Sequence, residues 1–318
     1  MWVGGAVPGA KSSGKTAKVQ YAIGSAQGPI QFANLEFLKF KVSDQAFSTL
    51  LPSPPPAVFP QNRLRLTDHR VFRIVSATGK TDGTGLVGLG PNRGSNVREI
   101  IGTSAGNGVL DRIFLSNTST PNYLTTLLGR SDDPTDIYPG DITVGEVVQG
   151  FENITTMPKL PVAQVSLREK VDQHWQVLLD KDGIIGPDGK TINATSIVDG
   201  GKRLNAVLDT GFSLSQVPRQ IADAIYGRIP GATFGAVGRG VGETWKFPCD
   251  VEVNLTFSIG GVKYPIHPLD TSLDWSENGT SFCIGSVSAL VCPCHAYGSP
   301  NFSVCSSSLG SSTTTTMT

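Results

Sequence analysis

Short stretches of alternating apolar and polar residues, interrupted by glycine and proline, run through most of the chain. Residues 17–50 alternate in this way and are broken by Gly24, Gly28 and Pro29, which predicts strands around a turn. Residues 252–268 alternate on both sides of a Gly-Gly pair, and this pattern predicts a β-hairpin. Because a period of two places one face of a strand against a core, these patterns favour β structure.

The other patterns predict short strands and few helices. Residues 173–192 predict a strand, a turn and a strand, and residues 140–147 predict the edge of a hairpin. Residues 98–116 could carry a short helix. Residues 219–229 follow Pro218 and predict an amphipathic helix, whose apolar face consists of Ile221, Ala224, Ile225 and Ile229. Since helix is scarce throughout, the predicted fold class is mainly β.

Composition suits a turn-rich β protein and argues against some functions. The chain has 318 residues, including 37 Gly and 21 Pro, and its formal net charge is zero. This length is sufficient for two lobes with separate cores. The lack of a basic patch argues against a nucleic-acid partner, and no uninterrupted apolar run is long enough to cross a bilayer. Residues 296–318 are rich in Ser and Thr and predict a low-complexity, disordered tail.

Six N-x-S/T sequons suggest passage through the secretory pathway. They begin at Asn117, Asn153, Asn193, Asn254, Asn278 and Asn301. One or two sequons would be expected by chance in a chain so rich in Ser and Thr, so six favour a glycosylated, secreted, extracellular or vacuolar protein. Residues 1–15 lack the apolar region of a signal peptide. We therefore expect the natural N-terminus to lie further upstream.

The five cysteines all lie in the last quarter of the chain. Cys249 and Cys283 flank a strand-like stretch, and we expect them to form a disulfide. An odd number leaves at least one thiol unpaired or bonded to another chain. Cys292, Cys294 and His295 are spaced too tightly for a common zinc knuckle, so no metal is expected.

One short motif has the composition of a catalytic turn. Residues 205–218 read NAVLDTGFSLSQVP: an apolar run, Asp209-Thr210-Gly211, then Ser213 and a second apolar stretch. The apolar run predicts a buried strand, and the turn after it would present Asp209 at a cleft. Ser213 could donate a hydrogen bond that holds the carboxylate ionised. The alternative is an ordinary turn in which Asp209 caps its own loop.

The order of segments resembles that of pepsin-like aspartic proteases over most of residues 2–290. QYAIGSAQGPI resembles the flap hairpin, DGTGLVGLGP the first-lobe hydrophobic-hydrophobic-Gly loop, and AVLDTGFSLSQVP the second active-site motif. GDITVGEV, HWQVLLDKDGIIG and PCDVEVNLTFSIGGVKYPIHP are similar to three further segments of the family in the same order. The sequence departs from the family at Ala22 and Ile23 in the flap and at Phe212 after D-T-G.

The resemblance implies a bilobal pepsin-like acid protease fold that is incomplete at both ends. Residues 1–150 would be the rest of the N-terminal lobe with its flap, residues 151–295 the C-terminal lobe with the D-T-G motif, and residues 296–318 the tail. Beyond Leu290 the resemblance ends, so the last strand of the second lobe is expected to be missing. Tyr21, Gly24 and Ser25 match flap positions that contact substrate, and Asp209 matches a catalytic carboxylate.

The family needs a second carboxylate, and this chain has only one D-T-G. Trp2 matches the tryptophan that follows the first motif, which implies that the partner carboxylate lies just upstream of Met1. The other candidates match structural positions or lack the motif: Asp44, Asp82, Asp141 and Asp270. The chain is therefore expected to be a fragment with little or no activity of its own.

The implied function is hydrolysis of peptide bonds by two carboxylates and an activated water. It requires no metal and no organic cofactor, and the implied partner is a polypeptide substrate bound by a monomer. An alternative is a catalytically inactive pepsin-like protein that binds peptides or partners. A symmetric dimer with one D-T-G from each chain conflicts with the remnants of two different lobes, and an extracellular β-rich binding module leaves the ordered motifs unexplained.

Overall fold

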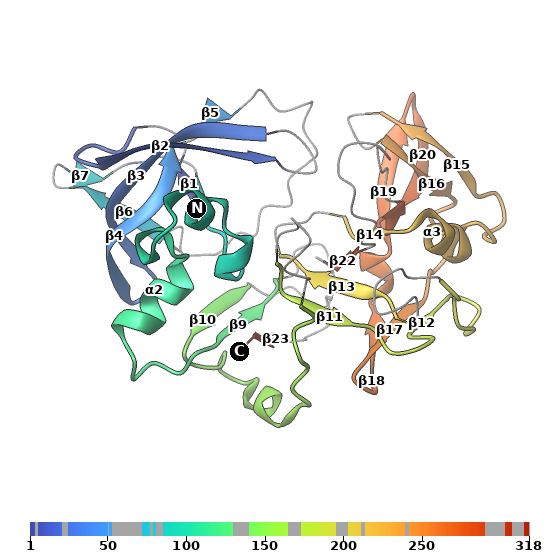
Figure 1. The fold of residues 1–318 in the computed structure, drawn as a ribbon. Coiled ribbons are helices and arrows are strands. Elements are labelled where there is room, and N and C mark those ends of the chain that lie inside the picture. Colours follow the sequence, from blue (N-terminus) through green and yellow to red (C-terminus); the bar gives the residue numbers. More distant parts are fainter. Residues whose placement is uncertain are drawn as a thin grey trace.

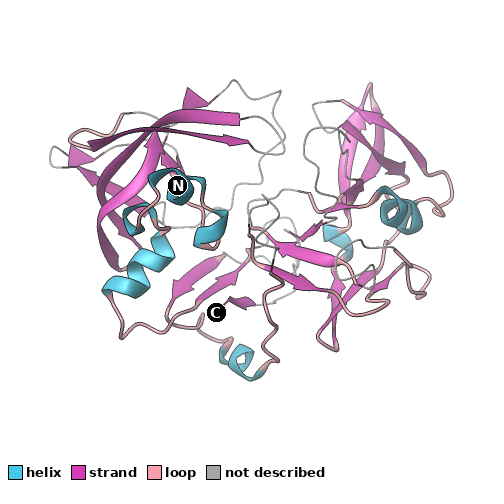
Figure 2. Ribbon diagram, in the orientation of Figure 1, coloured by secondary structure: helices cyan, strands magenta, loops and turns pink. Residues whose placement is uncertain are grey.

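The structure is a computed structural model that describes residues 1–3, 6–20, 25–49, 51–52, 72–76, 79–80, 85–129, 140–164, 173–194, 203–210, 214–238, 242–289, 303–306 and 315–317. Strands predominate among these residues, and the helices are few and short (Figure 2). The mainly β class predicted from the sequence is confirmed.

The first part of the chain forms an eight-stranded sheet with the order β7-β6-β3-β4-β1-β8, in which β2 and β5 also pair with β3. The strands predicted within residues 17–50 are present, but Gly28 and Pro29 lie inside β3 and do not interrupt it. The strands are β1 (Trp2–Val3), β2 (Lys11–Gln20), β3 (Ser25–Phe37), β4 (Phe40–Thr49), β5 (Leu51–Pro52), β6 (Phe72–Ser76), β7 (Gly79–Lys80) and β8 (Gly85–Leu86).

Two helices and two strands follow this sheet. The helix expected within residues 98–116 is in fact two helices, α1 (Asn96–Ile101) and α2 (Val109–Ser116), because Gly102 ends α1 in the left-handed conformation at φ 77°. The short 3₁₀ turns η1 (Asn92–Gly94) and η2 (Ser104–Gly106) precede them, and η3 (Glu152–Thr156) comes later. Strands β9 (Leu124–Leu127) and β10 (Asp141–Val144) then form an antiparallel pair.

The second part of the chain forms three more sheets, which Figure 1 shows on the opposite side of the molecule from β2–β7. A five-stranded sheet has the order β11-β13-β22-β14-β21, a three-stranded sheet β12-β17-β18, and a four-stranded sheet β15-β16-β20-β19. The bounds are β11 (Gln176–Leu178), β12 (Ile184–Ile185), β13 (Asn205–Leu208), β14 (Gln216–Val217), β15 (Thr233–Val237), β16 (Gly242–Phe247), β17 (Leu255–Ile259), β18 (Val262–Ile266), β19 (Ser272–Glu277), β20 (Thr280–Gly285) and β21 (Ser288–Ala289).

Turn chemistry explains two hairpins of this second part. Gly260 and Gly261 both have positive φ, so they form the tight turn between β17 and β18 that the Gly-Gly pair predicted. Asn278 and Gly279 do the same between β19 and β20. A 3₁₀ turn, η5 (Pro268–Asp270), joins β18 to β19.

Helix α3 (Arg219–Tyr226) is shorter than the predicted 219–229 and turns a different face inward. Its buried residues are Ile221, Ala222, Ile225 and Tyr226, whereas Ala224 is only partly buried. Ile229 lies beyond the end of the helix and packs, partly buried, against the same core. The Tyr226 hydroxyl donates to the carbonyl of Thr271 at 2.7 Å and accepts from the amide of Val287 at 3.2 Å.

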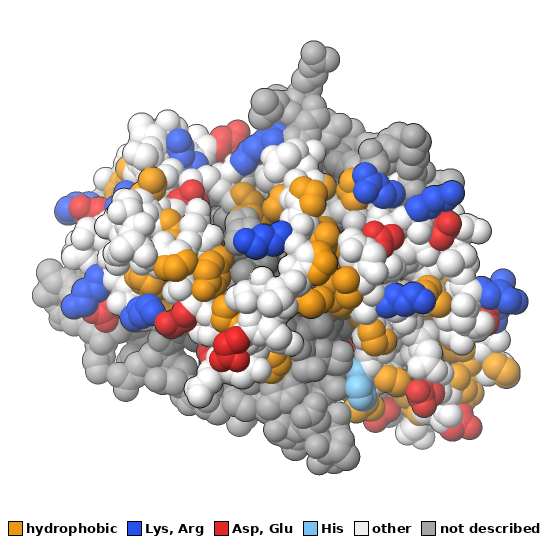
Figure 3. Space-filling view, turned by 90° about the horizontal axis from the view of Figure 1, so that it is seen from below, with side chains coloured by type: hydrophobic (Ala, Val, Ile, Leu, Met, Phe, Trp, Pro, Cys, Tyr) orange, Lys and Arg blue, Asp and Glu red, His pale blue; other side chains and the backbone are white. Residues whose placement is uncertain are grey.

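Buried apolar side chains of the described residues gather separately in the two parts of the chain. One cluster contains buried residues from Val177 to Ala289. A second cluster runs from Val3 to Val144, beside a smaller one that includes Ile30 and Val97. On the face drawn in Figure 3, Lys and Arg side chains are interspersed with Asp and Glu, and neither sign gathers into a patch among the coloured residues.

The tail differs from the expectation of disorder. Residues Ser303–Ser306 form β22, which lies between β13 and β14, and residues Thr315–Met317 form β23, which pairs with β9. The prediction of a wholly disordered tail with no further strand beyond Leu290 is therefore wrong for these two segments. A four-residue strand between two partners is held by its main-chain hydrogen bonds, which leave no apolar signature in the sequence.

Candidate functional site

Asp209 follows a buried strand, as the sequence predicted. Within β13, Asn205, Ala206 and Val207 are buried, while Leu208 and Asp209 are partly exposed and Thr210 is exposed. The exposure therefore rises step by step toward the carboxylate. This gradient arises because the apolar run fills the core of the second part and the chain then leaves it at the D-T-G turn.

The end of β13 is held by its neighbours on both sides. β11 pairs antiparallel with β13, and β22 pairs parallel with it and places Ser306 opposite Leu208. The amide of Leu208 also donates to the carbonyl of Trp175 at 2.8 Å. The main chain just before Asp209 is thus fixed by backbone hydrogen bonds.

Other residues expected at the site lie partly outside the described residues. Gly211, Phe212 and Ser213 of the active-site loop lie outside them, and so do Tyr21 and Gly24 of the flap. Ser25 is the first residue of β3 and pairs with Gln20 of β2, so the hairpin that would carry the flap is present up to its tip.

The two parts of the chain repeat one arrangement of strands. β1 is parallel to β4, with Trp2 opposite Ser48, and antiparallel to β8, with Trp2 opposite Leu86. β14 is likewise parallel to β21, with Gln216 opposite Ser288, and antiparallel to β22.

A single hydrogen bond recurs at the same point in both arrangements. The carbonyl of Met1, just before β1, accepts from the amide of Ser48 at 3.1 Å, and the carbonyl of Ser215, just before β14, accepts from the amide of Ser288 at 2.8 Å. Trp2 therefore corresponds to Gln216, which lies seven positions after Asp209.

The acidic residues set aside in the sequence analysis have structural surroundings. Asp44 is exposed, has φ 47° and forms a 2.9 Å ion pair with Lys11. Asp141 is exposed and accepts from the amide of Ile142 at 2.7 Å. Asp270 is part of η5, and Asp82 lies outside the described residues.

Asp180 is a carboxylate outside the D-T-G motif that accepts three hydrogen bonds. It accepts from the Ser258 hydroxyl at 2.8 Å and from the amides of Gly260 and Gly261 at 2.9 and 2.8 Å. Burial opposes ionisation, but these hydrogen bonds and the charge of Arg203 together lower the pKa of Asp180 below its ordinary value of 3.8. Its side-chain hydrogen bonds all go to the β17–β18 hairpin, which is consistent with a structural role.

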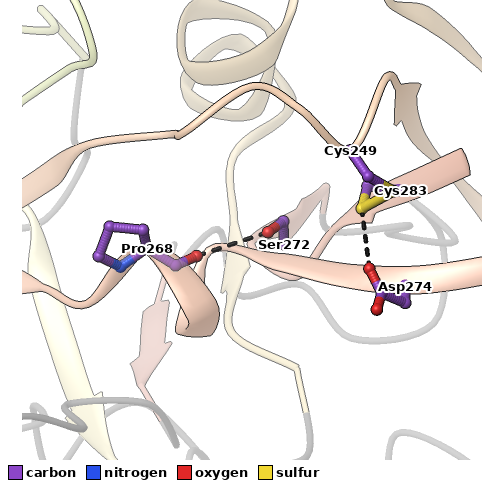
Figure 4. Close-up of a disulfide and its surroundings, with 5 residues drawn as sticks. All are labelled: Cys249, Pro268, Ser272, Asp274 and Cys283. Carbon is purple, nitrogen blue, oxygen red and sulfur yellow. Dashed lines mark hydrogen bonds between the residues drawn. A yellow bond between two sulfur atoms is a disulfide. The ribbon is translucent and has the colours of Figure 1, made fainter. Parts of the chain in front are cut away.

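Cys249 and Cys283 form the expected disulfide, with a sequence separation of 34 (Figure 4). The carboxylate of Asp274 lies 3.3 Å from the Cys283 sulfur. These three residues are also the one group among the described residues with metal-type ligands close enough together. Because the two sulfurs are bonded to each other, neither is available as a thiolate ligand.

The sequon asparagines within the described residues are all at the surface. The exposed ones are Asn117, Asn153, Asn193, Asn254 and Asn278, whereas Asn301 lies outside the described residues. Asn117 ends α2, and its side-chain oxygen accepts from the hydroxyl of Ser119, the third residue of its sequon, at 3.4 Å. No helix of the described residues is long and apolar enough to cross a membrane.

Comparison with known proteins gives one consistent family. A family model for eukaryotic aspartyl protease matches residues 137–299. Major aspartyl peptidase 1 of Cryptococcus neoformans is 26% identical over 254 residues, which covers 71% of this chain and 50% of that protein. A probable aspartic-type endopeptidase CTSD of Trichophyton verrucosum is 34% identical over 97 residues, 30% of this chain and 16% of that protein.

A solved structure shows the same fold. The aspartic proteinase from Irpex lacteus superposes with a TM-score of 0.63 at 15% identity, covering 97% of this chain and 81% of that one. The fold and the D-T-G strand therefore define the class of pepsin-like aspartic proteinases. The chain belongs to the eukaryotic aspartyl protease family, and it spans half the length or less of the curated relatives named here.

Sequence reasoning missed one feature close to Asp209. The indole nitrogen of Trp175 donates to the carbonyl of Leu89 at 2.8 Å and so joins the two parts of the chain. The only signal in the sequence was a tryptophan directly before a strand, and that pattern does not reveal a partner 86 positions away.

Proposed function

We propose that this protein is an aspartic endopeptidase in which Asp209 is one of two carboxylates that activate a water molecule against a peptide bond. The observation that carries the proposal is the position of Asp209, at the end of a buried strand that pairs with β22, next to a strand arrangement that occurs twice. Membership of the aspartyl protease family supports it independently.

The second carboxylate is proposed to lie in a segment that precedes Trp2 in the sequence. Since Trp2 corresponds to Gln216 and Asp209 lies seven positions before Gln216, the matching position lies seven residues before Trp2.

The chemistry follows from two carboxyl groups that face each other. Both cannot ionise at low cost, so the pair shares one proton around a bound water. The ionised member removes a proton from the water, and the protonated member polarises the peptide carbonyl and later helps to protonate the leaving amine. Tyr21, Gly24 and Ser25 would belong to a flap that closes over the substrate and excludes water.

The proposal is tested with the full-length protein and a quenched-fluorescence peptide between about pH 2 and pH 7. Asp209→Asn is expected to lower kcat by roughly 10²–10⁴-fold, because the substituted amide cannot take part in proton transfer. Asp182→Asn is the matched control, since Asp182 is an exposed acidic residue of the same part of the chain. Full activity in Asp209→Asn would exclude the dyad.

If the full-length protein carries no carboxylate before Trp2, the alternative is a catalytically inactive protein that binds peptides. Titration of the unaltered protein with an uncleaved peptide then separates a peptide-binding protein from one without a working cleft.

The cellular setting is proposed as secreted, extracellular or vacuolar, with N-linked glycans. The exposure of the five described sequon asparagines supports this. The proposed lobes are residues 1–150 and 151–295, followed by the tail 296–318. The protein is proposed to be a monomer, in which one full-length chain carries both carboxylates of the site. Digestion of the secreted protein with an N-glycosidase, followed by mass measurement, tests the glycans.

A further inference from the structure

Trp175 makes hydrogen bonds in two directions. Its main-chain carbonyl accepts from the amide of Leu208, the residue before Asp209. Its indole nitrogen donates to the carbonyl of Leu89 in the first part of the chain at 2.8 Å. The side chain is partly buried, so water competes only weakly for this bond.

The segment that carries Leu89 is tied to the first part of the chain. Leu89 packs against the apolar cluster that runs from Val3 to Val144, and it follows β8, which pairs directly with the strand of Trp2. A few residues on, the side-chain oxygen of Asn92 accepts from the amide of Gly108 at 2.7 Å and fixes η1 next to α2. The carbonyl of Leu89 is therefore a rigid acceptor.

The segment that carries Trp175 is equally fixed on its own side. Gln173 is 3% exposed, and its side-chain amide donates to the carbonyls of Ala163 and His174 at 3.0 and 2.9 Å. Gln176, at the start of β11, donates to the same carbonyl of Ala163 at 2.9 Å. Figure 1 shows β11 beside β13 near the middle of the molecule, between the first sheet and α3.

A second contact lies next to the first. A Cβ atom at Gly94 in η1 would collide with the carbonyl oxygen of Gln173, so the two main chains are in direct contact there. Two rigid segments thus meet at two points, and only one of these, the indole hydrogen bond, depends on a side chain.

We propose that Trp175 is a positioning residue that fixes the strand of Asp209 relative to the loop beside β8, and hence sets the separation of the two active-site carboxylates. This inference rests on the proposed acid-protease function. Trp175 acts through the main chain at Leu208 and Leu89 rather than through contact with the substrate.

Such a role has a specific kinetic consequence. The sharing of one proton by two carboxyl groups weakens steeply as they move apart. Weaker coupling brings the two apparent ionisations closer together, and the bell-shaped pH–rate profile becomes narrower. Simple loss of folded protein lowers the whole profile without changing its width.

The test uses Trp175→Phe, which keeps an aromatic ring but removes the indole donor. Trp245→Phe is the matched control: its indole also donates, to the carboxylate of Asp223 at 2.9 Å, but both residues lie within the second part of the chain. In the full-length enzyme, we expect Trp175→Phe to lower kcat about tenfold, to leave KM within about twofold, and to narrow the pH–rate profile. Trp245→Phe should keep the parent width.

A second measurement does not require activity. Amide hydrogen exchange of the 318-residue chain is compared for the two variants. Trp175→Phe should speed exchange at Leu208 and in residues 85–90 on the order of fivefold, and Trp245→Phe should change neither segment. Unchanged exchange at both segments, or an unchanged profile width in an active enzyme, overturns the inference. An inactive full-length protein overturns the proposed function but not the inference about Trp175. The hydrogen-exchange result still shows whether the Trp175 contact holds the two segments.

Discussion

At the scale of single residues, Asp180 makes the stability of the fold depend on pH. Its three hydrogen bonds hold the β17–β18 turn, where Gly260 and Gly261 have φ values of 60° and 80°. Because the pKa of Asp180 is lowered in the folded state, its stabilisation is fully present above the ordinary value of 3.8. It is lost as the pH falls through that value toward the folded-state pKa.

We predict that Asp180→Asn lowers the free energy of unfolding near neutral pH and flattens its decline between about pH 5 and pH 2. The amide offers one acceptor oxygen in place of two and carries no charge, so protonation at low pH removes less stabilisation from the variant. Urea midpoints measured across this pH range provide the check. Asp182→Asn, an exposed change two positions away, should keep the parent slope. Parallel slopes for Asp180→Asn and the parent would contradict the prediction.

The sequence could predict some residues of the site but not their neighbours. Asp209 was recognisable because an apolar run, D-T-G and a later helix stand in a fixed local order. The disulfide of Cys249 and Cys283 was also predictable from its flanking strand pattern. The hydrogen bond between Trp175 and Leu89 was not predictable. Its acceptor is a main-chain carbonyl, and every residue has one, so the sequence does not mark the partner.

At the scale of elements, η1 is where the first part of the chain meets the second. Gly94 lies at the end of η1 with its main chain against Gln173, and nothing larger than hydrogen fits there. The contact is between two main chains, and neither can move aside as a flexible side chain could.

Gly94→Ala is expected to cost about 1–3 kcal/mol of unfolding free energy, because the added methyl group must displace a main chain. Gly90→Ala is the matched control, since a Cβ at Gly90 meets no atom within 4 Å. Its effect should stay within about 0.5 kcal/mol. Urea unfolding followed by circular dichroism measures both, and equal midpoints for the two variants would argue against a close contact at Gly94.

Elements with strong local patterns were predictable, and those defined by distant pairing were not. The β17–β18 hairpin has alternating residues and a Gly-Gly turn, and both are local signals. The two strands predicted within residues 173–192 exist, yet β11 pairs with β13 and β12 pairs with β17 rather than with each other. β22 reads Ser-Val-Cys-Ser, too short for a periodic pattern, and its place between β13 and β14 makes it a strand.

At the scale of the whole molecule, the buried side chains divide at the middle of the chain. Among the described residues, the cluster that starts at Val3 and the smaller one beside it contain no buried residue beyond Val144, and the third cluster contains none before Val177. The Trp175 bond and the η1 contact join the two parts without merging their cores. Separate cores of this size favour separate unfolding transitions.

The final prediction compares two phenylalanines, one in each core. Phe47 of β4 is 0% exposed and Phe247 of β16 is 2% exposed, so truncation to alanine should cost a similar amount at each site, about 3–5 kcal/mol. Amide exchange at increasing urea then reports each part of the chain. Phe47→Ala should reduce protection in β3 and β4 while sparing β17 and β18, and Phe247→Ala should do the reverse. If either variant lowered protection equally in both parts, the molecule would unfold as one cooperative unit. The contacts between the parts would then be as important energetically as the cores themselves.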